Sequence, residues 1–315
     1  MENQINIYLG IFFPDLIKWY PDKLINSKFA YYTNAETAMK IIGNREIWLR
    51  NATVMNDFSE ISYGNSLLEK TMSSPVGKDF ITSLELVFPG IKTEVCSLLN
   101  EGIHKLKDNI YLSCLSIHDN SENQTGRLSM WRAYGDVALI INSTPFSVET
   151  SKLGVFSTPV QYLNQSDLEK RIYKMTKDIN NNTDLIRGMG KDYLVNILEQ
   201  MLIQTVIGTK HPGFREENEW RVYFNQTNRR HPVLTRKVES IGGVSQVIWA
   251  LPLRDDPANG LYKADIPSLF FRMIIGPTQF PNVIATAFKV LLEDAGVKDI
   301  SGKIVVSDIP LRKHV

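Results

Sequence analysis

The most unusual stretch of the sequence runs from residue 210 to residue 221, where a turn, three carboxylates and two guanidinium groups precede a predicted strand. Because side chains alternate along a strand, Glu217, Glu219 and Arg221 fall on one face and Trp220 on the other. Neighbouring carboxylates repel, so an arginine or a ligand cation is expected beside them. The simplest interpretation is a strand with one solvated face and an ion pair. The alternative is a carboxylate that stabilises a cationic transition state.

Two further segments could contribute to a site. Trp131 and Tyr134 are three residues apart, so on a helix they would share one side, as core pairs usually do. The run 31–33, Tyr-Tyr-Thr, precedes a predicted helix and is consistent with a strand end in which Thr33 caps that helix. The polar run 56–60 favours a turn with a helix cap, although its groups could also orient a ligand.

The charged and metal-binding residue types set limits on function. The chain has 35 basic and 34 acidic residues, so no global field draws it to nucleic acid or to an anionic membrane. A local basic patch could still meet phosphates, although charge runs are more often solvated; it consists of Arg229, Arg230, His231, Arg236 and Lys237. The two cysteines lack C-x-x-C spacing and the five histidines form no cluster, so we expect no metal site.

Periodicity places these residues on a mixed set of elements. A short helix follows Thr33 and Asn34, and two helical blocks are expected at about 60–107 and 166–207. The first block is interrupted near 73–77 and 89–90, and the second at 180–182, where the residue types favour turns. Strands are expected at 46–49, 110–116, 137–141, 219–224, 244–251, 270–275 and 304–306, with a helix at 282–295.

This order of elements predicts an α+β fold with a mixed or antiparallel sheet core and helical insertions. No glycine-rich turn follows a strand, which disfavours a doubly wound dinucleotide-binding fold. Without a long linker, we expect residues 1–28 to form an N-terminal extension packed on a single α+β domain of residues 29–315. There is no cationic leader and no apolar run of ~18 residues, which favours a cytoplasmic protein with no membrane partner.

An ordered string of short motifs resembles one family, the bacterial domain-of-unknown-function family numbered 2971. The resemblance runs from about Phe29 to Arg312. It is carried by Tyr31-Tyr32-Thr33, Ile47-Trp48-Leu49, Asn56-Asp57 with Glu60, Cys114-Leu115-Ser116, Met130-Trp131 with Tyr134, Phe214 with Glu217-x-Glu219-Trp220-Arg221, Ile275-Gly276-Pro277 and Ser307-x-Ile309-Pro310-x-Arg312.

A more distant similarity is to ADP-ribosyltransferases, which use an early His-x-Thr-like strand, a middle Ser or Tyr motif and a late strand with a catalytic glutamate. The resemblance implies that Glu219, with Glu217 beside it, stabilises the cation formed when NAD loses nicotinamide. It further implies that the dinucleotide is held by Tyr31, Tyr32, Thr33, Ser116, Trp131, Tyr134 and Arg221. Tyr31 stands where the pattern has histidine, so a hydroxyl would replace an imidazole donor.

Three functions are therefore compared. The first is an NAD-dependent ADP-ribosyltransferase or NAD glycohydrolase, acting as a toxin or phage-defence effector on a protein or nucleic-acid acceptor. The second is a non-catalytic module that binds a nucleotide or nucleic acid through the basic patch and nearby aromatic residues. The third is a structural or protein-binding domain in which the motifs are core and caps. The sequence favours the first, with NAD as substrate and no metal.

Overall fold

A computed structural model of the chain describes residues 2–19, 22–55, 59–102, 106, 108–146, 152–227, 231 and 233–311. The chain forms two compact units, each assembled from three separate segments. The first unit contains residues 1–19, 51–110 and 158–215, and the second contains residues 20–50, 111–157 and 216–315. All nine residues expected at the site belong to the second unit.

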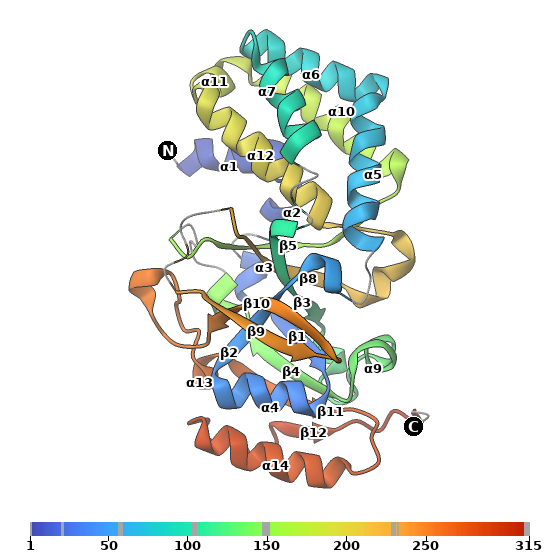
Figure 1. Cartoon of the computed structure of the whole chain (residues 1–315), viewed down its shortest axis with the longest axis vertical. Helices are drawn as coiled ribbons and strands as arrows, with labels where there is room; N and C mark the ends of the chain where they lie inside the picture. The colour runs from blue at the N-terminus through green and yellow to red at the C-terminus, as the bar shows by residue number, and fades with distance from the viewer. Residues whose placement is uncertain are drawn as a thin grey trace. The chain divides into compact units, whose positions relative to one another are not determined.

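The first unit is mainly helical (Figure 1). Its helices are α1 (Glu2–Phe12), α2 (Pro14–Ile17), α5 (Ser59–Ser73), α6 (Pro75–Val87), α7 (Ile91–Ser97), η2 (Leu98–Gly102), α10 (Gln165–Asn181), α11 (Thr183–Arg187) and α12 (Lys191–Ile207), with the short turn η1 (Ala52–Val54). A two-stranded parallel sheet of β6 (Gln161–Tyr162) and β7 (Thr209–Lys210) completes it. The interruptions expected within both helical blocks are confirmed. Pro75 opens α6 and Gly90 is the N-cap of α7, and Asn182 separates α10 from α11. No helix in the described part of the chain is long and apolar enough to cross a membrane.

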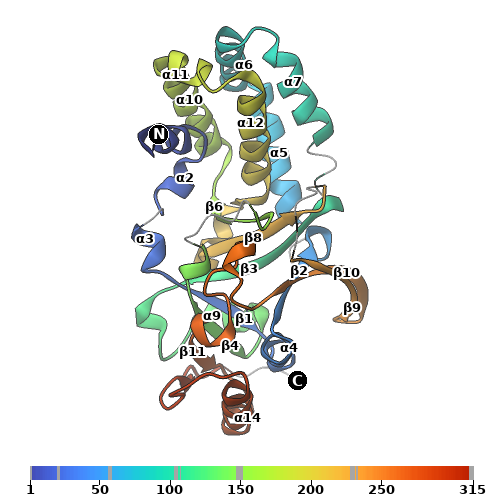
Figure 2. The same cartoon turned by 90° about the vertical axis from the view of Figure 1, so that its left-hand side faces the viewer.

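The second unit is built on one large sheet (Figure 2). Its strands are β1 (Lys28–Thr33), β2 (Glu46–Asn51), β3 (Ile110–His118), β4 (Val137–Asn142), β5 (Val155–Pro159), β8 (Glu219–Asn225), β9 (Thr235–Ile241), β10 (Val244–Pro252), β11 (Phe270–Ile275) and β12 (Ile304–Val306). The order along the sheet is β12-β11-β4-β1-β3-β2-β10-β9, and β8 pairs with both β3 and β5. β11 and β12 run parallel, whereas β1, for example, runs antiparallel to both β3 and β4. The expected α+β fold with a mixed sheet is therefore confirmed.

Short helices complete the second unit. They are α3 (Asp22–Ile25), α4 (Ala35–Asn44), η3 (Asn120–Glu122), α9 (Leu128–Tyr134), η4 (Thr144–Phe146), η6 (Pro257–Asn259), α13 (Ile266–Leu269) and α14 (Pro281–Asp294), and η5 (Pro212–Glu217) leads into β8. Asn34, rather than Thr33, is the N-cap of α4, since its side chain accepts from the backbone N–H of Thr37 at 2.8 Å. Thr33 instead remains in β1.

The sheet has two differently covered faces. On the first face, Tyr32, Ala138 and Ile274 pack with Trp131 from α9. On the second, Leu139 and Met273 pack with α4 and α14, which contribute Ala38, Ile41, Phe288 and Leu292. Because neighbouring strand residues point to opposite faces, each candidate residue can be assigned to one face by its position in its strand.

Candidate active site

Arg127, immediately before α9, is the centre of a polar cluster on the first face of the sheet. Its Nε donates to Glu122 Oε1 at 2.8 Å, and its Nη2 donates to Glu122 Oε2 at 3.0 Å. The Nη1 atom donates to Ser116 Oγ at 2.6 Å and to the backbone carbonyls of Glu216 and Glu217 at 3.0 and 2.8 Å. One half-buried guanidinium thus joins β3, the η3 turn and the segment that carries the candidate carboxylates.

Glu217 is held by both its main chain and its side chain. Its carbonyl oxygen also accepts from the Ser116 hydroxyl, and its Oε1 accepts from the Tyr134 hydroxyl at 3.1 Å. The next residue, Asn218, has a left-handed φ of 46°, and its carbonyl accepts from the Ile117 N–H at 2.7 Å. This bend separates Glu217 from β8, so the expectation that Glu217 and Glu219 lie side by side on one strand face is wrong. Glu217 is half-exposed.

Glu219 and Arg221 form a buried ion pair on β8. Arg221 Nε donates to Glu219 Oε1 at 2.7 Å, and Nη2 donates to Oε2 at 3.1 Å. The expected ion pair is therefore present, but the expected solvated face is wrong, because every β8 residue from Glu219 to Phe224 is buried. Trp220 packs against Phe29 on the second face, with ring centroids 5.2 Å apart, so Glu219 and Arg221 point to the opposite side. That side is the face that carries Ser116.

Tyr32 and Trp131 form an aromatic floor beside Arg127. The two rings meet edge to face with centroids 4.8 Å apart. The Tyr32 hydroxyl accepts from the Arg127 backbone N–H at 2.9 Å, and the Trp131 indole N–H donates to the Thr125 carbonyl at 2.9 Å. Burial, reinforced by the Glu122 carboxylate, raises the pKa of Tyr32 to about 12. Tyr32 and Trp131 are both buried. Of the pair Trp131 and Tyr134 expected in the core, only Trp131 is fully buried, whereas Tyr134 is half-buried and packs against the same cluster.

Tyr31 and Thr33 lie on the other face of the sheet. Their partners in β4 are Leu139 and Val137, both of which pack on the second face, whereas Tyr32 pairs with Ala138 on the first. Thr33 is buried, and its carbonyl accepts from the Asp136 N–H at 3.1 Å. The structure therefore gathers seven of the nine expected residues on one face and separates Tyr31 and Thr33 from them. The seven are Tyr32, Ser116, Trp131, Tyr134, Glu217, Glu219 and Arg221.

Sequence reasoning missed three polar residues of this cluster, namely His118, Glu122 and Arg127. His118 Nε2 lies 2.9 Å from Asn123 Oδ1, and its Nδ1 lies 3.7 Å from Glu122 Oε2. Burial lowers the pKa of His118, which favours its neutral form. The signal that could have found Glu122 is the capping box Asp119-x-x-Glu122, which the structure contains in full. No sequence pattern of this kind marks Arg127.

Three residues of the expected basic patch, Lys237, His231 and Arg236, belong to the described part of the chain. Lys237 pairs with Glu46, with Nζ 2.6 Å from Oε2. His231 packs against Trp249, with ring centroids 5.0 Å apart. Arg236 is exposed. Arg229 and Arg230 lie outside the described residues, as do Asn56, Asp57 and Phe58 of the polar turn expected at 56–60.

Comparison with known proteins gives one match. Residues 130–222 match the family described as "Protein of unknown function (DUF2971)". The DUF2971 match includes five of the expected site residues, namely Trp131, Tyr134, Glu217, Glu219 and Arg221. No curated protein and no solved structure matches the chain. Among the described residues, no group of three or more His, Cys, Asp or Glu side chains is placed to hold a metal ion.

Proposed function

We propose that the chain cleaves the bond between nicotinamide and ribose in NAD, as an NAD glycohydrolase or an ADP-ribosyltransferase, and that Glu217 is the catalytic carboxylate. One observation carries the proposal. Glu217 is half-exposed and yet fixed, by the Tyr134 hydroxyl at its Oε1 and by Ser116 and Arg127 at its carbonyl. A carboxylate held in advance can stabilise developing positive charge without reorganising during the reaction.

The chemistry is a substitution at C1′ of the nicotinamide ribose. The C1′–N bond breaks, and its electron pair leaves with nicotinamide, whose ring loses its positive charge. The resulting oxocarbenium-like ribose is stabilised by the Glu217 carboxylate, as carboxylates stabilise such cations in glycoside hydrolysis. Water or a nucleophile of an acceptor then attacks C1′ and releases a proton. A water acceptor gives ADP-ribose, and a macromolecular acceptor gives an ADP-ribosylated product.

Glu219 has a supporting role in this proposal. It is 4% exposed and holds Arg221 through two hydrogen bonds, so its charge is balanced within the protein. It positions β8, and therefore Glu217, instead of contacting the ribose. Tyr32 and Trp131 form the apolar floor against which the site is built. Tyr31 and Thr33 would not contact this substrate, because they lie on the second face.

The test follows free nicotinamide after purified protein is mixed with NAD, alone and with cell extract. Glu217→Gln should reduce nicotinamide release by at least ~100-fold, a loss typical of removing one charge-stabilising group. Glu216→Gln is the matched control, because Glu216 is an exposed neighbour of similar shape and should retain full activity. Tyr134→Phe keeps the ring but removes the hydrogen bond to Glu217, so it should lower kcat more than it changes KM.

Glu219→Gln should act mainly on stability, because it removes the carboxylate charge that Arg221 contacts inside the protein. We expect a loss of about 3–5 kcal/mol in unfolding free energy. The proposal would be wrong if wild-type protein released no nicotinamide under either condition. If NAD raised the melting temperature but stayed intact, the non-catalytic nucleotide-binding function would replace it.

A further inference from the structure

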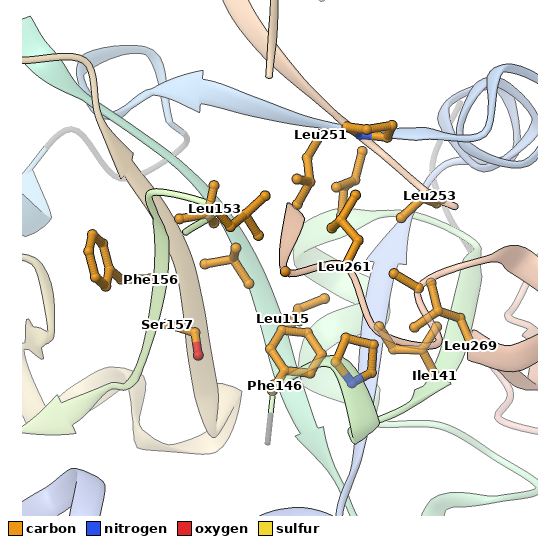
Figure 3. A pocket seen from close by; sticks show the side chains of 17 residues that line it. Leu115, Ile141, Phe146, Leu153, Phe156, Ser157, Leu251, Leu253, Leu261 and Leu269 are labelled. Atoms are coloured by element: carbon orange, nitrogen blue, oxygen red, sulfur yellow. The ribbon is translucent and has the colours of Figure 1, made fainter. Parts of the chain in front are cut away.

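A cavity of about 100 Å³ lies in the second unit, on the face of the sheet opposite the candidate active site. Six strands contribute to its wall, with Ile47 from β2, Leu115 from β3, Ile141 from β4, Val155 from β5, Val222 from β8 and Leu251 from β10 among the lining residues. Figure 3 shows side chains of these strands and of the segment around Leu261 meeting at one space. The walls of the cavity therefore come from regular elements as well as from loops.

The lining is almost entirely hydrocarbon. Ser157 carries the only polar side chain among the lining residues, and none of them is charged. A water molecule needs two to four polar partners, which this lining does not offer. A closed apolar cavity of about 150 Å³ binds benzene, and this smaller space is open at its rim, so a ring need not fit entirely within it. An unfilled apolar space forfeits dispersion contacts, which a ligand of matching shape would restore.

We propose that this cavity is a binding site for an uncharged hydrocarbon group, either a small aromatic ring or the end of an aliphatic chain. Half-buried Leu253 and Phe156 border it, which gives such a group a route inwards, whereas a charged group would find no partner in the lining. The site is distinct from the one assigned to NAD. Leu115 points into the cavity, and its neighbour Ser116 points to the opposite face and contacts Arg127.

The test uses benzene as the probe and the full-length chain. Benzene should raise the melting temperature in a concentration-dependent way, because a ligand that binds only the folded state stabilises it. Benzenesulfonate, which carries the same ring with a charge, should produce no shift. Ala264→Leu fills the cavity from the buried residue Ala264 and should weaken benzene binding by at least ~10-fold. Ala287→Leu, at an exposed position of α14, is the matched control and should bind like wild type.

A second cavity-filling variant keeps the test valid if Ala264→Leu fails to fold. Leu253→Phe adds volume at the half-buried rim, where neighbouring side chains can adjust more readily than in the core. It should also weaken benzene binding. A structure of the wild-type protein under xenon pressure should show xenon among Leu115, Leu153 and Leu261. The proposal is overturned if benzene produces no shift up to its solubility limit, or if folded Ala264→Leu and Leu253→Phe bind it as tightly as wild type.

Discussion

Arg127 connects residues that are distant in the sequence. Its two contacts with Glu122 are charge-assisted and bidentate, a geometry that only arginine provides among the basic residues. Its remaining contacts are with the Ser116 hydroxyl and with the backbone carbonyls of Ile117, Glu216 and Glu217. Arg127 therefore fixes the main chain that carries the Glu217 carboxylate.

Tyr32 should give the site a measurable pH signature. Its pKa is raised to about 12 in the folded protein, compared with about 10 in an unfolded chain. The stability contributed by the neutral phenol is therefore complete below about pH 10 and is lost as pH rises towards 12. Tyr32→Phe removes this dependence, but it also takes the acceptor from the partly buried Arg127 N–H, at a cost of about 1–3 kcal/mol.

The measurement is urea unfolding of wild type and Tyr32→Phe at about pH 9 and about pH 11. The difference in unfolding free energy between the two proteins should shrink by about 1.4 kcal/mol at the higher pH, because only wild type carries the perturbed phenol. The same difference at both pH values would contradict a raised pKa. Tyr173→Phe, at an exposed tyrosine of α10, serves as the control and should show no such change.

At the scale of elements, α9 is fixed to the sheet by its tryptophan. The Trp131 ring lies between Gly126 and Gly276, and a side chain at either glycine would collide with it. Gly276 follows β11 directly, and its N–H donates to the Asp136 carbonyl at 2.7 Å. The position of α9, and with it that of Tyr134, therefore depends on the absence of a side chain at the end of β11.

Gly276→Ala should displace this packing. Its Cβ would lie 2.7 Å from Trp131 Cε3, which forces the buried ring or the backbone to move. We expect a loss of about 1–3 kcal/mol in unfolding free energy, as for other overpacked cores. Gly43→Ala in α4 meets nothing within 4 Å and should be neutral or stabilising by up to about 1 kcal/mol. Chemical denaturation of both variants provides the comparison, and equal stabilities would refute the account.

Elements with strong local patterns could be predicted from the sequence. The strands 270–275 and 304–306 were expected at the bounds the structure gives. β9 was missed because its residues are mostly charged or polar and it is largely exposed. The signal that could have found it is the pair Gly242-Gly243, whose positive φ angles of 59° and 80° form the turn to β10.

The site was harder to predict than the fold because its contacts join distant residues. The carboxylates, Ser116 and Tyr134 could be selected from motif order, but their assignment to one face needed strand register. Tyr31 and Thr33 show the limit, since adjacent residues of β1 point to opposite faces. The bend at Asn218 interrupts the alternation on which the pairing of Glu217 with Glu219 relied.

At the scale of the whole molecule, both compact units are assembled from three chain segments each. If one unit unfolded alone, its segments would become long flexible loops between the segments of the other unit. Closing these loops costs conformational entropy, which lowers the stability of the unit that stays folded. We therefore keep the prediction of a single domain for residues 29–315, in the sense that the two units should unfold together in one cooperative transition. It concerns how the units unfold and does not depend on their arrangement.

Differential scanning calorimetry tests this prediction directly. We expect one endothermic transition in which the calorimetric and van't Hoff enthalpies agree. Glu219→Gln, which weakens only the second unit, should lower the single melting temperature without splitting the transition. Two resolved transitions, with only one of them shifted by the variant, would instead mean that the units unfold as separate domains.

The order of strands in the sheet also constrains how the protein can be made on the ribosome. β4 lies between β1 and β11, but β11 is synthesised only after β5 to β10 have been added. At ~5–20 residues per second, the β11 side of β4 stays without its partner for on the order of ten seconds. An apolar strand edge left open for that time can pair with another chain. The nascent protein is therefore exposed to aggregation until almost the whole sheet has emerged.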